Sequence, residues 1–296
     1  MSRKSANALL LLTAALWGMG FICTQYVIEA NFSAVQLAAA RFVVGAAFLT
    51  LVFRKKLRNV SKETFFVSAF LGALMAFGLG LQIYGQKYST PSTCAFITAV
   101  YVIIVPFLES AIFRKAPRPL IWVCAAATLV GVCLISVTDS LTVSLGAALT
   151  LIATLFFAAQ VALTELFVKK HDPVALGVVG ADFIAVCATV LAVIIYFIDG
   201  RLPVFNTGSV MSLLYMGLAG TGICLVMQNL AQKYTTASQA SIIMSTECIF
   251  GSAFSVILLG EALGIRLVAG SALIVASIVI SNINFNTFKQ KSDKTG

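Results

Sequence analysis

The chain contains ten apolar stretches that are each long enough to cross a lipid bilayer as a helix. A helix of about 20 apolar residues spans the hydrocarbon core and satisfies its own backbone hydrogen bonds, so stretches of this length predict membrane spans. The connections between them are short and leave no room for a separate soluble domain. We therefore predict an all-α integral membrane protein with ten transmembrane helices, at Asn7–Ile28, Ala34–Phe53, Thr64–Tyr84, Ser92–Phe113, Leu120–Val137, Leu145–Phe167, Val174–Ile198, Ser209–Leu230, Ser238–Leu259 and Ile265–Phe285.

The placement of charge agrees with lipid as the surrounding solvent. Only 10% of the residues are charged, against about 25% in an average soluble domain. The net charge of +9 could suggest nucleic-acid binding, and the positions of the basic residues distinguish this from a membrane-orientation signal. Apart from Arg41, which lies within a span, all of them except Lys87, Arg201 and Arg266 fall on the N-terminal side of the membrane. This positive-inside pattern predicts a multi-pass plasma-membrane protein with both termini in the cytoplasm and no nucleic-acid partner.

Motifs for enzyme chemistry are missing from the sequence. It has one histidine, no His-Glu-x-x-His sequence and no Gly-x-x-x-x-Gly-Lys-Ser/Thr sequence for binding ATP. All seven cysteines fall inside predicted spans without metal-ligand spacing, which favours packing over a metal site or a disulfide. We therefore expect no catalytic site, no metal and no cofactor.

The chain also resembles itself at an offset of 146 residues, where Gln82 aligns with Gln228 and the sequence QKYST at 86–90 aligns with QKYTT at 232–236. A weaker match at an offset of 140 links the first and sixth spans, with Leu16-Trp17 against Phe156-Phe157 and Thr24-Gln25 against Thr164-Glu165. Each half, 5–140 and 141–288, then holds five predicted helices. Because five is odd, the second half enters the membrane from the opposite side. Such inverted repeats let a transporter expose one central site to each face in turn.

Five motifs spread over nearly the whole chain carry a resemblance to a known family. They are Leu16-Trp17-Gly18, Arg41-Phe42, the segment 86–90, the fourth-span run at 95–106 and Gly260-Glu261-Ala262-Leu263. Together they resemble the EamA family of the drug/metabolite transporter superfamily. The resemblance implies a ten-helix plasma-membrane fold with a central cavity, and export of small metabolites such as amino acids or of toxic compounds. The chain departs from the family pattern at two places, with Phe113-Arg114-Lys115-Ala116-Pro117 where members often have a Gly-Glu pair, and Phe157-Ala158 as the second-half equivalent of Trp17-Gly18.

Polar side chains deep in the predicted spans are candidates for lining a cavity between the halves. A charge at the centre of a span costs about 2.5–3.5 kcal/mol, so each one needs a partner or a function. Arg41 could bind a substrate carboxylate or pair within the fold, and Glu247 could line the cavity or form an interhelical hydrogen bond. Trp17 needs a partner for its indole N–H, in the cavity or in the core. The predicted cavity residues are Trp17, Gln25, Arg41, Gln82, Thr98, Tyr101, Gln160, Gln228 and Glu247.

Proton coupling is a further hypothesis for the buried carboxyl groups. Glu247 lies nearest the middle of its span, where the charged form is costly, so it could exchange a proton during transport. Glu165 or Asp182 could relay that proton. Glu109 and Glu165 lie within about one turn of the cytoplasmic ends of their spans, where a solvated charge is the favoured interpretation. Asp182 fits a site residue and a partner for a basic group equally well.

Two features suggest how the fourth and ninth spans are shaped. Pro106 removes a backbone hydrogen bond and predicts a kink that frees the carbonyl near Val102. In the ninth span Glu247 lies about 200° around a regular helix from Ser245. If the serine stripe that includes Ser245 packs against a neighbouring helix, Glu247 faces the cavity.

These features favour a secondary transporter that exports small metabolites, such as amino acids or related compounds, by alternating access. Its expected partners are a small-molecule substrate, the lipid bilayer and protons. A facilitator, an exchanger or an importer of small organic solutes or drugs fits the same pattern. The alternative of a different class is a non-transporting structural or receptor-type membrane protein, which has no need of buried carboxylates or of an inverted repeat.

Overall fold

The computed structural model describes residues 1–58, 60–114, 118–136, 145–200, 202–260 and 265–282, and every regular element in these ranges is a helix. The helices are α1 (Arg3–Glu29), α2 (Ala34–Leu57), α3 (Lys62–Gln86), α4 (Pro91–Ala99), α5 (Tyr101–Phe113), α6 (Pro119–Ser136), α7 (Leu145–Phe167), α8 (Pro173–Asp199), α9 (Thr207–Tyr215), the π-helix η1 (Met216–Ile223), α10 (Cys224–Gln232), α11 (Ala237–Met244), α12 (Glu247–Leu259) and α13 (Ile265–Asn282). Helices α4 and α5, α9 to α10, and α11 and α12 follow one another almost without a gap. Three of the helical segments are therefore interrupted.

Eight of the helical segments are long and apolar enough to cross a membrane. The apolar parts of α6 and α13 are shorter, at Pro119–Gly131 and Val268–Ser277 within the described residues. Large apolar side chains such as Phe66, Phe197 and Ile257 are exposed on the outside of the bundle, which suits contact with lipid. The chain is thus a multi-pass membrane protein. The prediction of ten spans is supported at eight segments, whereas the described parts of α6 and α13 contain shorter apolar stretches.

Hydroxyl and amide side chains explain where several of the helices begin. Ser33 and Ser61 accept backbone N–H groups of the first turns of α2 and α3, and Asn206 does the same for α9. Thr90 and Thr236 cap α4 and α11 in the same way. Such N-caps satisfy donors that the helix itself leaves unpaired. The last two are equivalent in the sequence repeat, so the structure uses the repeated threonine twice for the same purpose.

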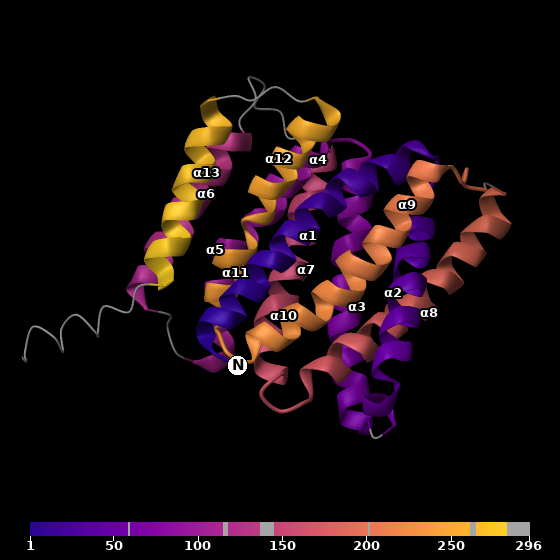
Figure 1. Ribbon diagram of the computed structural model, residues 1–296, viewed down its shortest axis with the longest axis horizontal. Coiled ribbons are helices and arrows are strands. Elements are labelled where there is room, and N and C mark those ends of the chain that lie inside the picture. The colour runs from indigo at the N-terminus through magenta and orange to yellow at the C-terminus, as the bar shows by residue number, and fades with distance from the viewer. Residues whose placement is uncertain (59, 115–117, 137–144, 201, 261–264, 283–296) are drawn as a thin grey trace, which may run out of the picture.

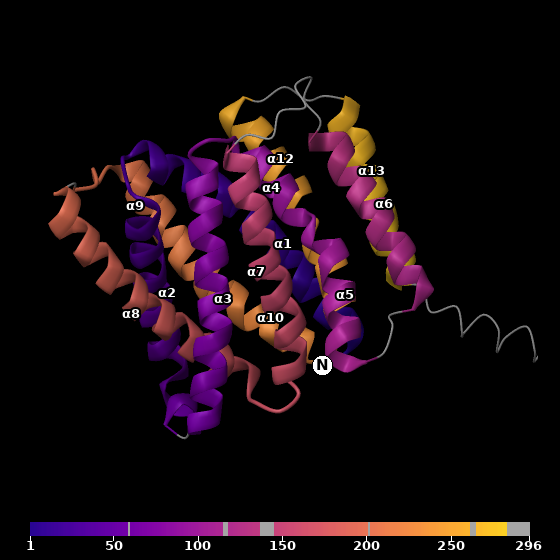
Figure 2. The ribbon, with the colours of Figure 1, turned by 180° about the vertical axis from the view of Figure 1, so that it is seen from behind.

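The helices of the two halves pack in matching pairs. Helix α1 contacts α9, α10 and α12, while α7 contacts α3, α4 and α5; α2 packs against α8, and α6 against α13. Figures 1 and 2 show the α6 and α13 pair at one edge of the molecule and α8 at the other. In Figure 1, α1 runs from the N-terminus at the lower side to the upper side, and α7 runs the opposite way. We refer to the side on which α1 begins as the lower face.

Two helix breaks lie at equivalent positions of the repeat. Val100 separates α4 from α5, and Ser245 and Thr246 separate α11 from α12. The hydroxyls of Ser245 and Thr246 donate to the carbonyls of Ile242 and Ile243, both at 2.7 Å, a type of contact that bends helices. Because of this break, the regular helical rotation expected between Ser245 and Glu247 does not apply.

The helix break in this segment does not lie at the position predicted from Pro106. Pro106 lies inside α5, and the helix is interrupted six residues earlier, at Val100. The break therefore does not coincide with the carbonyl near Val102 that the proline was expected to free.

Candidate substrate cavity

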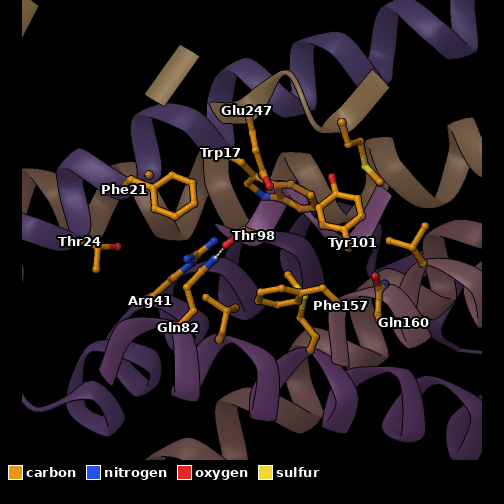
Figure 3. Close-up of a pocket in the computed structure, with 15 residues that line it drawn as sticks. Trp17, Phe21, Thr24, Arg41, Gln82, Thr98, Tyr101, Phe157, Gln160 and Glu247 are labelled. Atoms are coloured by element: carbon orange, nitrogen blue, oxygen red, sulfur yellow. Dashed lines mark hydrogen bonds between the residues drawn. The ribbon is translucent and has the colours of Figure 1, made fainter. Parts of the chain in front are cut away.

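A cavity lies at the two helix breaks, between the halves of the chain (Figure 3). It holds about 610 Å³ of space between protein atoms, but the centre of a water molecule can move in only about 60 Å³ of it. The cavity is therefore narrow in this conformation. Its lining comes from both halves: Trp17, Gly20, Phe21, Thr24, Arg41, Met75, Leu79, Gln82, Thr98, Tyr101, Phe157, Gln160, Val161, Met244 and Glu247.

Equivalent positions of the repeat meet in this cavity. Tyr101 is the first residue of α5 and Glu247 the first of α12, and they are related by the offset of 146. Trp17 and Phe157 are likewise related by the offset of 140. The cavity is thus built from the same backbone positions twice, with different side chains.

Arg41 lies in α2 and is buried, with 6% of its surface exposed. Its Nε–H donates to the hydroxyl of Thr221 in η1 at 2.7 Å. No carboxylate lies within ion-pair distance of Arg41 among the described residues. The guanidinium therefore does not extend toward the membrane surface, and it keeps donors free for another group in the cavity.

The π-helix η1 holds both the cation and the indole of the cavity. Trp17 donates its indole N–H to the carbonyl of Gly220 at 2.8 Å, one residue before Thr221, which binds Arg41. A π-helical turn disrupts the regular pattern of backbone hydrogen bonds and often occurs at functional sites. Glycine at position 220 also leaves room for Arg41, because an added Cβ would lie 3.3 Å from the guanidinium.

Glu247 carries a buried carboxyl group whose Oε1 has no hydrogen-bond partner among the described residues, and only 3% of the residue is exposed. The hydroxyl of Tyr101 is also buried without a partner in that part of the chain. Figure 3 shows both side chains pointing into the same space as Arg41 and Trp17. Because buried polar atoms are nearly always hydrogen-bonded, these atoms suit a polar ligand or an exchangeable proton.

Two amide side chains complete the polar lining. Gln82 donates from its side-chain nitrogen to the hydroxyl of Thr98 at 2.7 Å (Figure 3). Gln160 donates to Thr164 at 3.1 Å and accepts from Gln228 at 3.1 Å. Gln160 therefore joins the cavity to a buried amide group outside it.

The structure brings together seven of the nine side chains predicted for the cavity, namely Trp17, Arg41, Gln82, Thr98, Tyr101, Gln160 and Glu247. Gln25 is outside the lining and donates to Glu29 at 2.9 Å. Gln228 is fully buried between Gln160 and Gln232. Sequence reasoning missed Phe157 and Met244, although both lie at repeat positions equivalent to predicted residues, Trp17 and Thr98.

The other carboxylates lie away from the cavity. Glu165 is 4% exposed and is paired with Lys169 at 2.6 Å, so the expectation of a solvated charge is wrong for it. Glu109 is partly buried and accepts hydrogen bonds from Ser238. Asp182 accepts the hydroxyl of Thr50 on both oxygens, at 2.9 and 3.0 Å, beside a separate groove.

Comparison with known proteins agrees with this architecture. The model of the EamA-like transporter family matches residues 4–137 and again 144–283. An uncharacterized transporter from Archaeoglobus fulgidus is 26% identical over 285 residues, covering 96% of this chain and 87% of the relative. The fold is also similar to that of a protein known from a crystal structure, with a TM-score of 0.76 and 15% sequence identity. The similarity covers 95% of this chain and 98% of the other. The chain belongs to the EamA-like transporter family, within the drug/metabolite transporter superfamily, and is a membrane transporter.

Proposed function

We propose that the protein is a secondary carrier that exports small metabolites, amino acids or related compounds, across the plasma membrane by alternating access. The observation that carries this proposal is that Arg41 and Glu247 line the same cavity. They come from different halves, both are buried, and neither has an ion-pair partner among the described residues. A zwitterionic solute would place its carboxylate on the guanidinium and its ammonium on the carboxyl group.

The proposed topology has ten spans in two inverted repeats, 5–140 and 141–288, with both termini in the cytoplasm. The opposite directions of α1 and α7 and the matched contacts of the halves support it (Figure 1). The excess of basic residues on the N-terminal side supports the orientation. The lower face is then the cytoplasmic face.

Glu247 is the proposed proton-coupling residue. It lines the cavity, so a proton and a substrate ammonium group would compete for the same carboxyl oxygens. Glu165 and Asp182 have partners elsewhere and line other surfaces, so we confine the coupling role to Glu247. This competition would link substrate movement to the pH gradient.

Flux measurements in proteoliposomes test both parts of the proposal. The parent protein is expected to concentrate a labelled amino acid when a pH gradient is imposed. Glu247→Gln keeps the size of the side chain but cannot titrate. It should therefore abolish accumulation of the substrate driven by the pH gradient, while exchange of substrate across the membrane is partly retained. If Glu247→Gln concentrates substrate as well as the parent does, the carboxyl group is structural and the carrier is a facilitator or an exchanger. If the parent moves no solute, the transport proposal fails.

A further inference from the structure

The lower face carries two carboxylates that the cavity does not use. Glu109 near the end of α5 and Glu165 near the end of α7 both reach the first turn of α11. Glu165 Oε2 accepts the backbone N–H of Ala237 at 2.6 Å. Glu109 Oε2 accepts the backbone N–H of Ser238 at 2.7 Å and also its hydroxyl. The first turn of a helix has unpaired N–H groups and a partial positive charge, so it binds carboxylates well.

Neighbouring side chains hold this arrangement in place. The Lys169 ammonium group lies 2.6 Å from Glu165 Oε1 and 4.5 Å from the ring centre of Phe113. Arg3, at the start of α1, donates to the side chain of Gln239 in α11. Helices α1, α5 and α7 are therefore all tied to the start of α11.

At the opposite, upper face, three of the equivalent repeat positions carry different residues. By the repeat offsets, Pro91 corresponds to Ala237, Gln25 to Glu165, and Ser255 to Glu109. Proline has no N–H to donate. Gln25 instead donates to Glu29, and the buried hydroxyl of Ser255 has no partner in the described part of the chain. The two ends of the bundle are thus alike in backbone and different in chemistry.

Helix α11 connects the lower face to the cavity. It runs from Ala237, held by Glu165, to Met244, which lines the cavity, a rise of about 10 Å. Beside it, the side chain of Gln232 donates to the carbonyl of Val161 at 2.8 Å. The cavity itself extends along α1 only from Trp17 toward Thr24, away from the lower face. Helix α11, packed against α1, α5 and α7, therefore extends over the distance between the lower face and the cavity.

We propose that Glu109 and Glu165 form a carboxylate latch that holds α11 across the cytoplasmic end of a path between the cavity and the lower face, and that the latch must release before the cavity opens to the cytoplasm. This inference rests on the proposed function, which makes the lower face cytoplasmic and requires an opening there. Without the latch, the state that is open to the cytoplasm becomes more populated, because the closed state alone contains these hydrogen bonds.

Cysteine labelling tests the latch without relying on transport. A single cysteine is placed in the cavity lining by Val161→Cys, in a background with all seven native cysteines replaced. Inside-out vesicles expose the cytoplasmic face to a membrane-impermeant maleimide. The double variant Glu109→Ala with Glu165→Ala should be labelled about tenfold faster than the parent. Glu63→Ala, which removes an exposed carboxylate on the same face, should leave the rate unchanged.

A second variant keeps the test decisive if the alanine protein does not fold. Glu109→Gln with Glu165→Gln retains oxygen acceptors and removes the charge, so labelling should rise by about threefold. Labelling at the parent rate in the folded variants would overturn the latch. Substrate flux through the parent is measured separately, so a failure of the transport proposal is recognised independently of the labelling result.

Discussion

Replacing Arg41 with methionine separates a substrate-binding role from a fold-stabilising one. Arg41 donates one hydrogen bond, to Thr221, and has no ion-pair partner among the described residues. Losing a hydrogen bond from a charged group costs about 1.5–3 kcal/mol. Removing a guanidinium from a spanning helix gains at most about 2.5–3.5 kcal/mol, the cost at the centre of a span on insertion scales. The two effects largely offset each other, so the stability of the ligand-free protein should change by less than about 2 kcal/mol.

The response of Arg41→Met to ligand should differ sharply from that of the parent. A ligand at one hundred times its Kd stabilises the folded parent by about 2.7 kcal/mol, and the variant should lose that gain. The assay is thermal unfolding of purified protein with and without candidate amino acids. Thr221→Val is the matched control, because it removes the hydrogen bond and keeps the cation. If Arg41→Met is destabilised by more than about 3 kcal/mol and still responds to ligand, Arg41 serves the fold and the binding argument is refuted.

Two further predictions concern packing and pH. Gly18→Ala should destabilise the protein by about 1–3 kcal/mol in thermal unfolding, because the new Cβ would lie 2.7 Å from Phe250 Cβ and 2.9 Å from the backbone oxygen of residue 247. Gly20→Ala is the control and should not destabilise the protein, because a Cβ added there has no atom within 4 Å. Equal losses of stability in the two variants would contradict this reasoning. Burial alone would raise the pKa of Asp172, but hydrogen bonds from the amides that follow it and from Lys56 lower the pKa overall. The Asp172–Lys56 pair is exposed, so the ionised Asp172 contributes under about 1 kcal/mol to the free energy of unfolding. This contribution is present above about pH 4 and is lost as pH falls through the lowered pKa. When melting temperatures are measured over a pH series, Asp172→Asn should lack the loss of stability that the parent shows at low pH. The same pH dependence in parent and variant would argue against this role of Asp172.

The sequence predicts the fold well because lipid imposes strong rules on it. Helical spans need long apolar stretches, and helix starts need capping side chains such as Thr90 and Thr236, which the repeat preserves. The helix breaks are harder to predict. Val100 and Thr246 are neither glycine nor proline, and at Thr246 the hydroxyl bonds back onto the preceding turn. The proline that does signal a break, Pro106, lies inside a continuous helix.

The site is predictable only in part, because burial of a polar side chain does not reveal what it faces. Gln82 and Gln228 are repeat equivalents and look alike in the sequence, yet Gln82 lines the cavity and Gln228 is paired with other glutamines. Glu165 lies near a helix end, where a solvated charge is common, but the neighbouring α11 covers it. In both cases a helix from far along the chain decides the environment.

The repeat supports a division between a shared frame and specialised side chains. The amides of Gln86 and Gln232 donate to the carbonyls of Phe21 and Val161, each at 2.8 Å, so equivalent residues make the same hydrogen bond in both halves. At the cavity, by contrast, Tyr101 stands where the other half has Glu247. Under the proposed alternating access, the two halves exchange conformations, and this pair exchanges surroundings as well. In water a carboxyl group is a far stronger acid than a phenol. Each turn of the proposed cycle therefore moves the more acidic group of this pair between two environments while the frame stays the same.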